Sequence, residues 1–174
     1  VAVAVLAVVA LLTWNVAGFI FVVVMSAVHF GIGDAAFISE IDRRSVEPKK
    51  FAKYLYASAA GTLPVVIPLV NEKSTSALEK VNPVLVNWHH GLNYDLQLWV
   101  MILTAVALLR LVQKRRESDA LDLMLLYLLA VTAPPLVAFA VYFGCWHAMR
   151  HTARLTLTLP SSQAAFAEGK ARGA

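Results

Sequence analysis

Residues 1–30 contain no lysine, arginine, aspartate or glutamate, and this uncharged run constrains the fold more than any other feature. A helix needs about 20 mostly apolar residues to cross a bilayer, so the run is long enough for a full transmembrane span. The composition agrees, because 59% of the 174 residues are hydrophobic and 15% are charged, against about 45–50% and about 25% in soluble domains. The sequence therefore predicts an all-α, polytopic transmembrane helix bundle.

Further apolar runs predict about five spans, some of them kinked. We expect the first span to end at residues 31–34, where two glycines and an aspartate follow it, and the second to be kinked by Pro64 and Pro68. Pro134 and Pro135 allow either one long kinked helix or two spans. We favour two, because a single helix over 121–159 would be about 58 Å long and the hydrocarbon core is about 30 Å thick. The expected spans are residues 1–30, 51–70, 96–112, 121–132 and 136–158.

The segments outside the spans are polar. Residues 71–95 should form a loop with a short helix near 75–81, and Ser118 or Asp119 should cap the helix that starts near residue 121. We divide the chain into a transmembrane helical bundle, 1–159, and a flexible polar tail, 160–174. Because the chain begins with valine inside an apolar helix pattern, we expect its natural N-terminus to be missing or processed.

The basic residues lie in short clusters between apolar runs. The net charge is +4, but no stripe of basic and aromatic residues accompanies it, so we expect no nucleic-acid partner. The connections after the first and third spans are the most basic, and they should therefore be cytoplasmic. Cys145 is the single cysteine in the sequence, so no internal disulfide can form. The expected environment is a lipid bilayer; the oligomeric state stays open.

Three histidines in the apolar spans are candidate metal ligands. His147 and His151 are four residues apart, a spacing that places both imidazoles on one face of a helix. His29 lies near the expected cytoplasmic end of the first span, at a depth similar to that of His151. Imidazole binds Fe, Zn and Cu alike, so the ligands do not name the metal. Ionisable groups within spans usually mark function, but hydrogen-bonded histidines at a helix seam would show the same pattern.

Other candidate residues surround these histidines in the sequence. Asp34 could orient an imidazole N–H or be a solvated acid at the end of a helix. A pair of histidines in the loop over 71–95 is more consistent with a solvated loop than with ligation. Aromatic residues could line an apolar pocket or simply pack. The loop histidines are His89 and His90, and the candidate pocket residues are Phe30, Tyr142, Phe143 and Trp146.

Three segments of the chain resemble one family. Residues 29–34 read HFGIGD and resemble the HFG-x-x-D segment of the Brp/Blh family of membrane β-carotene 15,15'-dioxygenases. Residues 142–151 read YFGCWHAMRH and resemble its aromatic-rich H-x-x-R-H segment. Residues 61–68 read GTLPVVIP and resemble its G-x-x-P-x-x-x-P helix. The three segments occur in the family's order, and the two histidine motifs together are fairly specific.

The resemblance implies a multi-pass enzyme of a prokaryotic cell membrane that splits the central double bond of β-carotene with O₂ to give two molecules of retinal. Carried over to this chain, His29, His147 and His151 would be the catalytic residues and the ligands of Fe²⁺. The family's fourth histidine belongs to an upstream H-G-x-x-D segment, which the printed sequence does not contain. We therefore expect the chain to be N-terminally incomplete with respect to the family.

Other functions remain open at this point. A membrane hydroxylase or desaturase with a diiron site would use about eight histidines, and this sequence has five. A non-enzymatic transporter or assembly protein could use the same histidines as a metal or proton site. A purely structural bundle would hold them by hydrogen bonds. Oxygen consumption, retinal formation and bound iron distinguish these possibilities.

Overall fold

The computed structural model describes residues 5, 8, 9, 13, 15–42 and 51–168, and every regular element in them is helical. This confirms the predicted all-α bundle. Within the described residues, three helices are long and apolar enough to cross a membrane. These are α2 (Asn15–Asp42), α3 (Lys53–Val70) and α5 (Asn93–Gln113). The expected number of about five spans is therefore matched only approximately, because three described helices meet these criteria.

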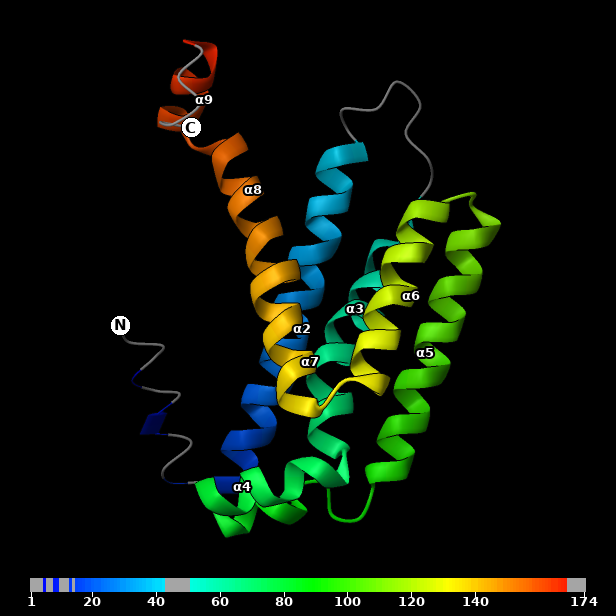
Figure 1. The fold of residues 1–174 in the computed structure, drawn as a ribbon, viewed down its shortest axis with the longest axis vertical. Helices are drawn as coiled ribbons and strands as arrows, with labels where there is room; N and C mark the ends of the chain where they lie inside the picture. Colours follow the sequence, from blue (N-terminus) through cyan, green and yellow to red (C-terminus); the bar gives the residue numbers. More distant parts are fainter. Residues whose placement is uncertain (1–4, 6–7, 10–12, 14, 43–50, 169–174) are drawn as a thin grey trace.

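The helices run up and down along one long axis (Figure 1). α2 rises, α3 descends, α5 rises and α6 descends, and the last stretch rises again beside α2. α3 lies in the middle of the bundle, where it packs against α2, α5, α6 and α7, and most of its residues are buried. The remaining elements are η1 (Glu72–Ser74), α4 (Thr75–Val81), η2 (Pro83–Asn87), α6 (Glu117–Thr132), α7 (Pro135–Val141), the π-helix η3 (Tyr142–His147), α8 (Ala148–Thr158) and α9 (Pro160–Ala167).

The chain reverses direction at Pro134, between the end of α6 and the start of α7 (Figure 1). Pro134 has an extended ψ of 139°, and Pro135 occupies the first position of α7, where its missing N–H costs nothing. The two prolines therefore separate two antiparallel helices, as expected, although neither α6 nor α7 is among the three described helices that are long and apolar enough to cross a membrane. α7, η3 and α8 then follow one another without interruption.

The sequence predicted that the first helix ends at residues 31–34, and this prediction is wrong. α2 continues to Asp42, because its glycines serve close packing rather than termination. A Cβ atom at Gly31 would overlap the carbonyl oxygen of Ala57 on α3, and a Cβ at Gly61 would overlap that of Ala27 on α2. Small residues that let two backbones approach are typical of membrane helix pairs. Most of residues 1–14 lie outside the described part of the chain.

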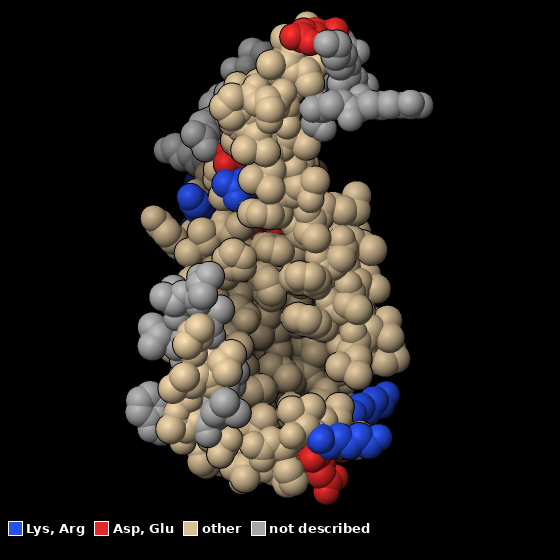
Figure 2. Space-filling model, turned by 90° about the vertical axis from the view of Figure 1, so that its left-hand side faces the viewer, with Lys and Arg blue, Asp and Glu red and all other residues tan. Residues whose placement is uncertain are grey.

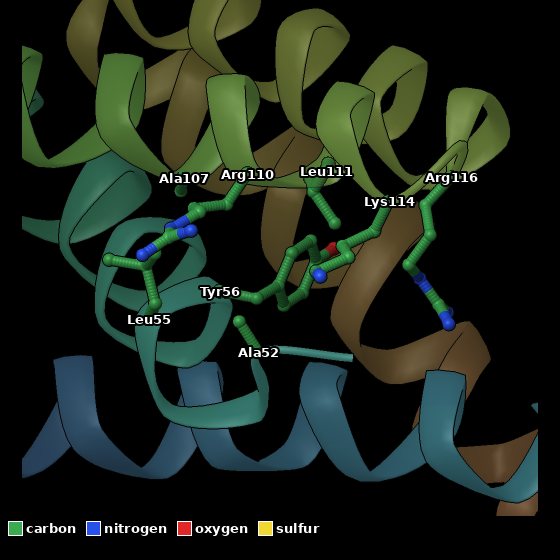
Figure 3. A pocket seen from close by; sticks show the side chains of 8 residues that line it. All are labelled: Ala52, Leu55, Tyr56, Ala107, Arg110, Leu111, Lys114 and Arg116. Carbon is green, nitrogen blue, oxygen red and sulfur yellow. The ribbon is translucent and has the colours of Figure 1, made fainter. Parts of the chain in front are cut away.

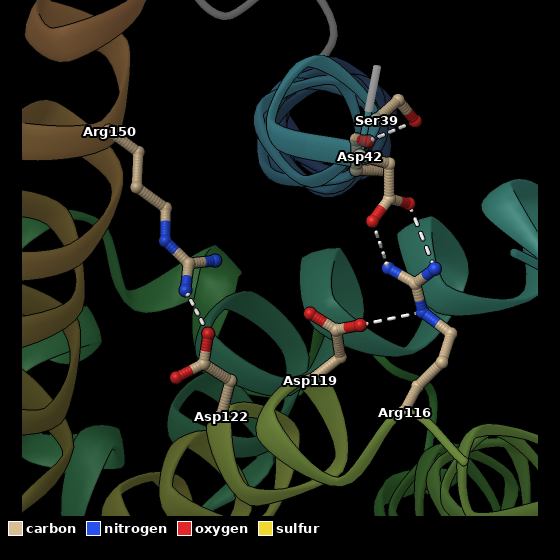
Figure 4. Close-up of polar contacts among 7 residues, drawn as sticks. Ser39, Asp42, Arg116, Asp119, Asp122 and Arg150 are labelled. Carbon is tan, nitrogen blue, oxygen red and sulfur yellow. Dashed lines mark hydrogen bonds and ion pairs between the residues drawn. The ribbon is translucent and has the colours of Figure 1, made fainter. Parts of the chain in front are cut away.

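The predicted cap of α6 is also wrong. α6 begins at Glu117 without a side-chain cap, and Asp119 instead accepts a hydrogen bond of 2.6 Å from Nε of Arg116 (Figure 4). The guanidinium of Arg116 also contacts both carboxylate oxygens of Asp42, at 2.8 and 3.1 Å. Arg116 thus ties the connection between α5 and α6 to the end of α2.

We call the end of the bundle at which α2 ends and α6 begins the basic end. Two further arginines bind carboxylates toward it: Arg154 contacts Glu40 at 2.8 and 3.0 Å, and Arg150 contacts Asp122 at 2.6 Å (Figure 4). The connection between α5 and α6, which we expect to be cytoplasmic, lies here. The other connection for which we expect this falls largely on residues 43–50, outside the described part. α9 occupies the start of the region for which we expected a flexible tail.

A cavity at the basic end is small. It lies around Tyr56, beside Arg110, Lys114 and Arg116 (Figure 3), and its volume is about 10 Å³. A single water molecule needs about 10–15 Å³, so the cavity is too small for an organic ligand. The space for a larger molecule lies elsewhere in the bundle.

Candidate functional site

The three candidate histidines come from the two helices at one side of the bundle. His29 lies near the middle of α2, His147 ends the π-helix η3, and His151 lies in the first turn of α8. The ring centroids of His29 and His147 are 5.5 Å apart, and those of His147 and His151 are 6.2 Å apart. The structure therefore places His147 close to both His29 and His151. Because α2 continues to Asp42, His29 is mid-helix and not at the end of a span, as we had expected.

The spacing of the rings can be compared with that of a shared metal ion. Two imidazoles bound to one ion at about 2.0–2.1 Å have ring centres roughly 5–6 Å apart, so both observed separations are close to this range. The rings of His147 and His151 are stacked, with an angle of 9° between their planes, and one must turn before both can bind one ion. In the described residues, no group of three His, Cys, Asp or Glu side chains is already arranged to hold a metal.

The environments of the three histidines differ. His147 is 5% exposed, whereas His29 and His151 are both exposed at the surface of the described bundle. His147 is therefore held by its neighbours, and the other two rings have room to turn. Three neutral imidazoles are a donor set that suits Fe(II), Zn or Cu, so the residues present fit a bound transition metal.

Asp34 lies directly behind His147. Its side chain is fully buried, and Oδ1 is 3.4 Å from Nδ1 of His147. Its other oxygen, Oδ2, accepts a hydrogen bond of 3.0 Å from the hydroxyl of Tyr142. The alternative of a solvated acid at a helix end is therefore wrong for Asp34. A carboxylate behind a metal-binding histidine is a common arrangement, because it orients the ring.

Gly33 makes room for the imidazole of His147. A Cβ atom at this position would lie 3.0 Å from Cε1 of His147, closer than an ordinary contact. The glycines of the HFGIGD segment thus have two roles: Gly31 permits the approach of α3, and Gly33 permits the approach of His147.

Three of the four predicted pocket residues surround His147. The ring of Phe30 is 4.6 Å from that of His147, Tyr142 is at 6.0 Å and Phe143 at 6.5 Å. The fourth, Trp146, instead lies against the guanidinium of Arg150, which is 4.8 Å from its ring centre. The aromatic cluster is therefore built mainly from η3 and α2.

Sequence reasoning missed Phe139. Its ring stacks on that of Phe143 at 6.1 Å and lies 6.4 Å from Phe30. The spacing of four residues between Phe139 and Phe143 could have indicated a shared helix face. Phe139 extends the aromatic cluster away from the histidines and toward a cavity.

This cavity has a volume of about 310 Å³ and lies between α2, α3, α4 and α7, and Phe139 forms part of its wall. Figure 2 shows that this side of the bundle is hollowed in its lower half, with uncharged side chains inside the hollow and charged side chains at its lower right edge. We call this space the α7 cavity. Its lining is almost entirely apolar, and Ser26 and Ser74 are its two hydroxyl-bearing residues. A second apolar cavity, of about 440 Å³, lies between α2, α3, η2 and α5.

The loop histidines are remote from this site. His89 and His90 follow η2 at the end of the bundle opposite the basic end (Figure 1). Nδ1 of His89 accepts a hydrogen bond of 3.2 Å from the backbone N–H of Gly91, and its ring contacts Trp88. These are local contacts of a turn. Cys145, the single cysteine in the sequence, is exposed.

Comparison with known proteins gives one family. The family model described as "Beta-carotene 15,15'-dioxygenase" matches residues 1–172, nearly the whole chain. No curated protein and no solved structure matches the chain significantly.

Proposed function

Because the chain belongs to the β-carotene 15,15'-dioxygenase family, we propose that it cleaves the central double bond of β-carotene with O₂ and forms two molecules of retinal. We further propose that His29, His147 and His151 bind the Fe²⁺ ion that this reaction requires. The observation that carries the proposal is the adjacency of three imidazole rings to an aromatic cluster and an apolar cavity.

The three histidines would hold a bound Fe(II) ion through three protein nitrogens, which are fewer ligands than this ion accepts. When bound, the iron supplies the redox chemistry that activates O₂ toward a carbon–carbon double bond. The protein's part is to present Nε2 of His147 from a buried position, with Asp34 3.4 Å behind its Nδ1.

The aromatic cluster and the α7 cavity suit a polyene. A carotene has no polar group that would need a hydrogen bond, so apolar walls hold it without the cost of desolvating polar atoms. Phe139 in the cavity wall lies next to Phe30, with 6.4 Å between the ring centroids. Phe30 in turn lies next to His147, with 4.6 Å between the ring centroids. One half of the substrate can lie in the cavity of about 310 Å³, so that its central bond lies near the histidines.

Pigment loss tests the proposal. The gene that encodes this chain, expressed in a host that accumulates β-carotene, should bleach the orange colour and yield retinal, and a His147→Ala variant expressed at the same level should not. Persistent pigment with well-expressed protein would contradict the proposal. If such protein nevertheless binds a metal, the non-enzymatic alternative, a transporter or assembly protein with a histidine site, takes its place.

A further inference from the structure

The π-helix η3 places two buried side chains on one face. Tyr142 and His147 are five residues apart, at the first and last positions of η3. In an α-helix, with about 3.6 residues per turn, residues at this spacing point roughly 140° apart. The i to i+5 bonding of a π-helix aligns them instead. Both side chains are accordingly buried, at 0% and 5% exposure, and both point to α2.

The two side chains meet the two oxygens of one carboxylate. The Tyr142 hydroxyl donates to Oδ2 of Asp34 at 3.0 Å, and Nδ1 of His147 lies 3.4 Å from Oδ1. The second distance exceeds the usual range of about 2.7–3.2 Å for an N–H donor, and both atoms lack another hydrogen-bond partner in the part of the chain that the structure describes. A buried carboxylate needs donors, and a proton on Nδ1 of His147, 3.4 Å away, would supply one to Oδ1. Arg150 and Tyr56 also interact electrostatically with this carboxylate.

The proton on Nδ1 decides which nitrogen can bind a metal. A neutral imidazole carries one N–H, so a ring that donates from Nδ1 has its free lone pair on Nε2. Without the Tyr142 hydroxyl, Asp34 would be a buried carboxylate with one unsatisfied oxygen, and it could turn away from His147. The hydroxyl thus fixes the carboxylate, and the carboxylate fixes the tautomer and the direction of the ring.

We propose that Tyr142 is a positioning residue, whose hydroxyl acts through Asp34 to hold His147 with Nδ1 protonated and Nε2 free. One part of this inference rests on the proposed function, namely that the free Nε2 binds iron. It differs from a role in lining the substrate pocket, because it assigns the effect to the hydroxyl and not to the ring.

The tautomer of His147 can be measured without a metal. Protein labelled with ¹⁵N-histidine is examined by NMR at a pH where the imidazole is neutral, and the signals of residue 147 are assigned from a His147→Gln variant. We expect the wild type to show protonated Nδ1, and Tyr142→Phe to show a mixture of tautomers. Tyr127→Phe removes a hydroxyl from α6 and should change nothing. A mixture in the wild type, or no change in Tyr142→Phe, would overturn the inference.

Metal affinity gives a second, independent readout. Co²⁺ is titrated into the purified chain against a chelator of known affinity. Loss of a group that orients a metal ligand typically weakens binding about 10–100-fold, and we expect this for both Tyr142→Phe and Asp34→Asn. Because Tyr142 acts through Asp34, the double variant should bind no more weakly than Asp34→Asn alone. Additive losses would refute the route through Asp34.

The two proposals can fail separately. A wild-type protein that holds the Nδ1-protonated tautomer and loses it in Tyr142→Phe, yet leaves carotene intact, counts against the proposed function only. A protein that cleaves carotene equally well and binds Co²⁺ equally tightly with and without the Tyr142 hydroxyl counts against the positioning role only.

Discussion

An alanine at position 33 would place its methyl carbon 3.0 Å from Cε1 of His147, whereas ordinary contacts of this kind begin at 3.4 Å. The imidazole, or the helix that carries it, must therefore retreat by a few tenths of an ångström. Distances from a metal to its ligands tolerate deviations of about 0.2 Å, so the displacement is large enough to disturb a site at His147. The backbone of α2 is not affected, because alanine is compatible with its helical conformation.

The expected effects on activity and on stability are different in size. A misplacement of about 1 Å can cost about 100-fold in rate, so we expect Gly33→Ala to reduce retinal formation on the order of 10-fold. Alanine favours a helix by about 1 kcal/mol over glycine, which offsets much of the about 1–3 kcal/mol that overpacking costs. The free energy of unfolding should therefore change by no more than about 2 kcal/mol.

Gly144→Ala is the matched control. Gly144 lies in η3 three residues before His147, and a Cβ atom there would meet nothing within 4 Å. Retinal formation is measured with purified protein in lipid vesicles, and thermal unfolding is followed by circular dichroism. We expect Gly33→Ala to lose activity with a nearly unchanged melting temperature and Gly144→Ala to retain both. Full activity in Gly33→Ala would refute the inferred crowding of His147.

Three further substitutions test other parts of the structure. Phe139→Ala should lower kcat/KM for β-carotene several-fold without changing metal content, because it removes an aromatic wall of the α7 cavity; unchanged kinetics would exclude this cavity from substrate binding. Gly61→Ala should destabilise the bundle by about 1–3 kcal/mol or more, because its methyl group would overlap the backbone of Ala27 and separate α2 from α3; a wild-type melting temperature would contradict that contact. Arg116→Gln should cost about 1.5–3 kcal/mol, because Asp42 and Asp119 both lose hydrogen bonds to a charged donor; a free energy of unfolding equal to that of the wild type would contradict these contacts.

Sequence reasoning was most successful where the signal is local. The short helix expected near residues 75–81 matches α4, and the second expected span, 51–70, differs from α3 by two residues at its start. The second span is an apolar run that ends before a polar segment, and the short helix lies within that polar segment and ends before Asn82 and Pro83. The reversal at Pro134 follows similarly from two adjacent prolines and the thickness of a bilayer.

The errors arise where a residue's role depends on a distant partner. Glycine can end a helix or allow another helix to approach, and only the position of Ala57 on α3 shows that Gly31 does the second. Asp119 could cap a helix, but Arg116 is held between it and Asp42. In both cases the role that the structure shows depends on a contact with another helix.

The candidate site was foreseeable in part. The four-residue spacing of His147 and His151 is visible in the sequence, but the approach of His29 depends on how α2 and α8 pack. The π-helix has no evident sequence signal, so the alignment of Tyr142 with His147 could not be predicted. Without the π-helix, the sequence predicts only a pocket-lining role for Tyr142. In the structure its hydroxyl donates a hydrogen bond to Asp34.

The α7 cavity is hollowed into the side of the bundle and not into either end (Figure 2). If a bilayer surrounds this side of the bundle, as we expect, a ligand that enters there would come from the acyl chains without passing through water. The occupancy of the cavity then depends on the mole fraction of the ligand in the lipid phase. Adding vesicle lipid at a constant total amount of carotenoid should slow turnover by surface dilution, and retinal formed in the cavity would leave into the same leaflet from which the carotenoid came.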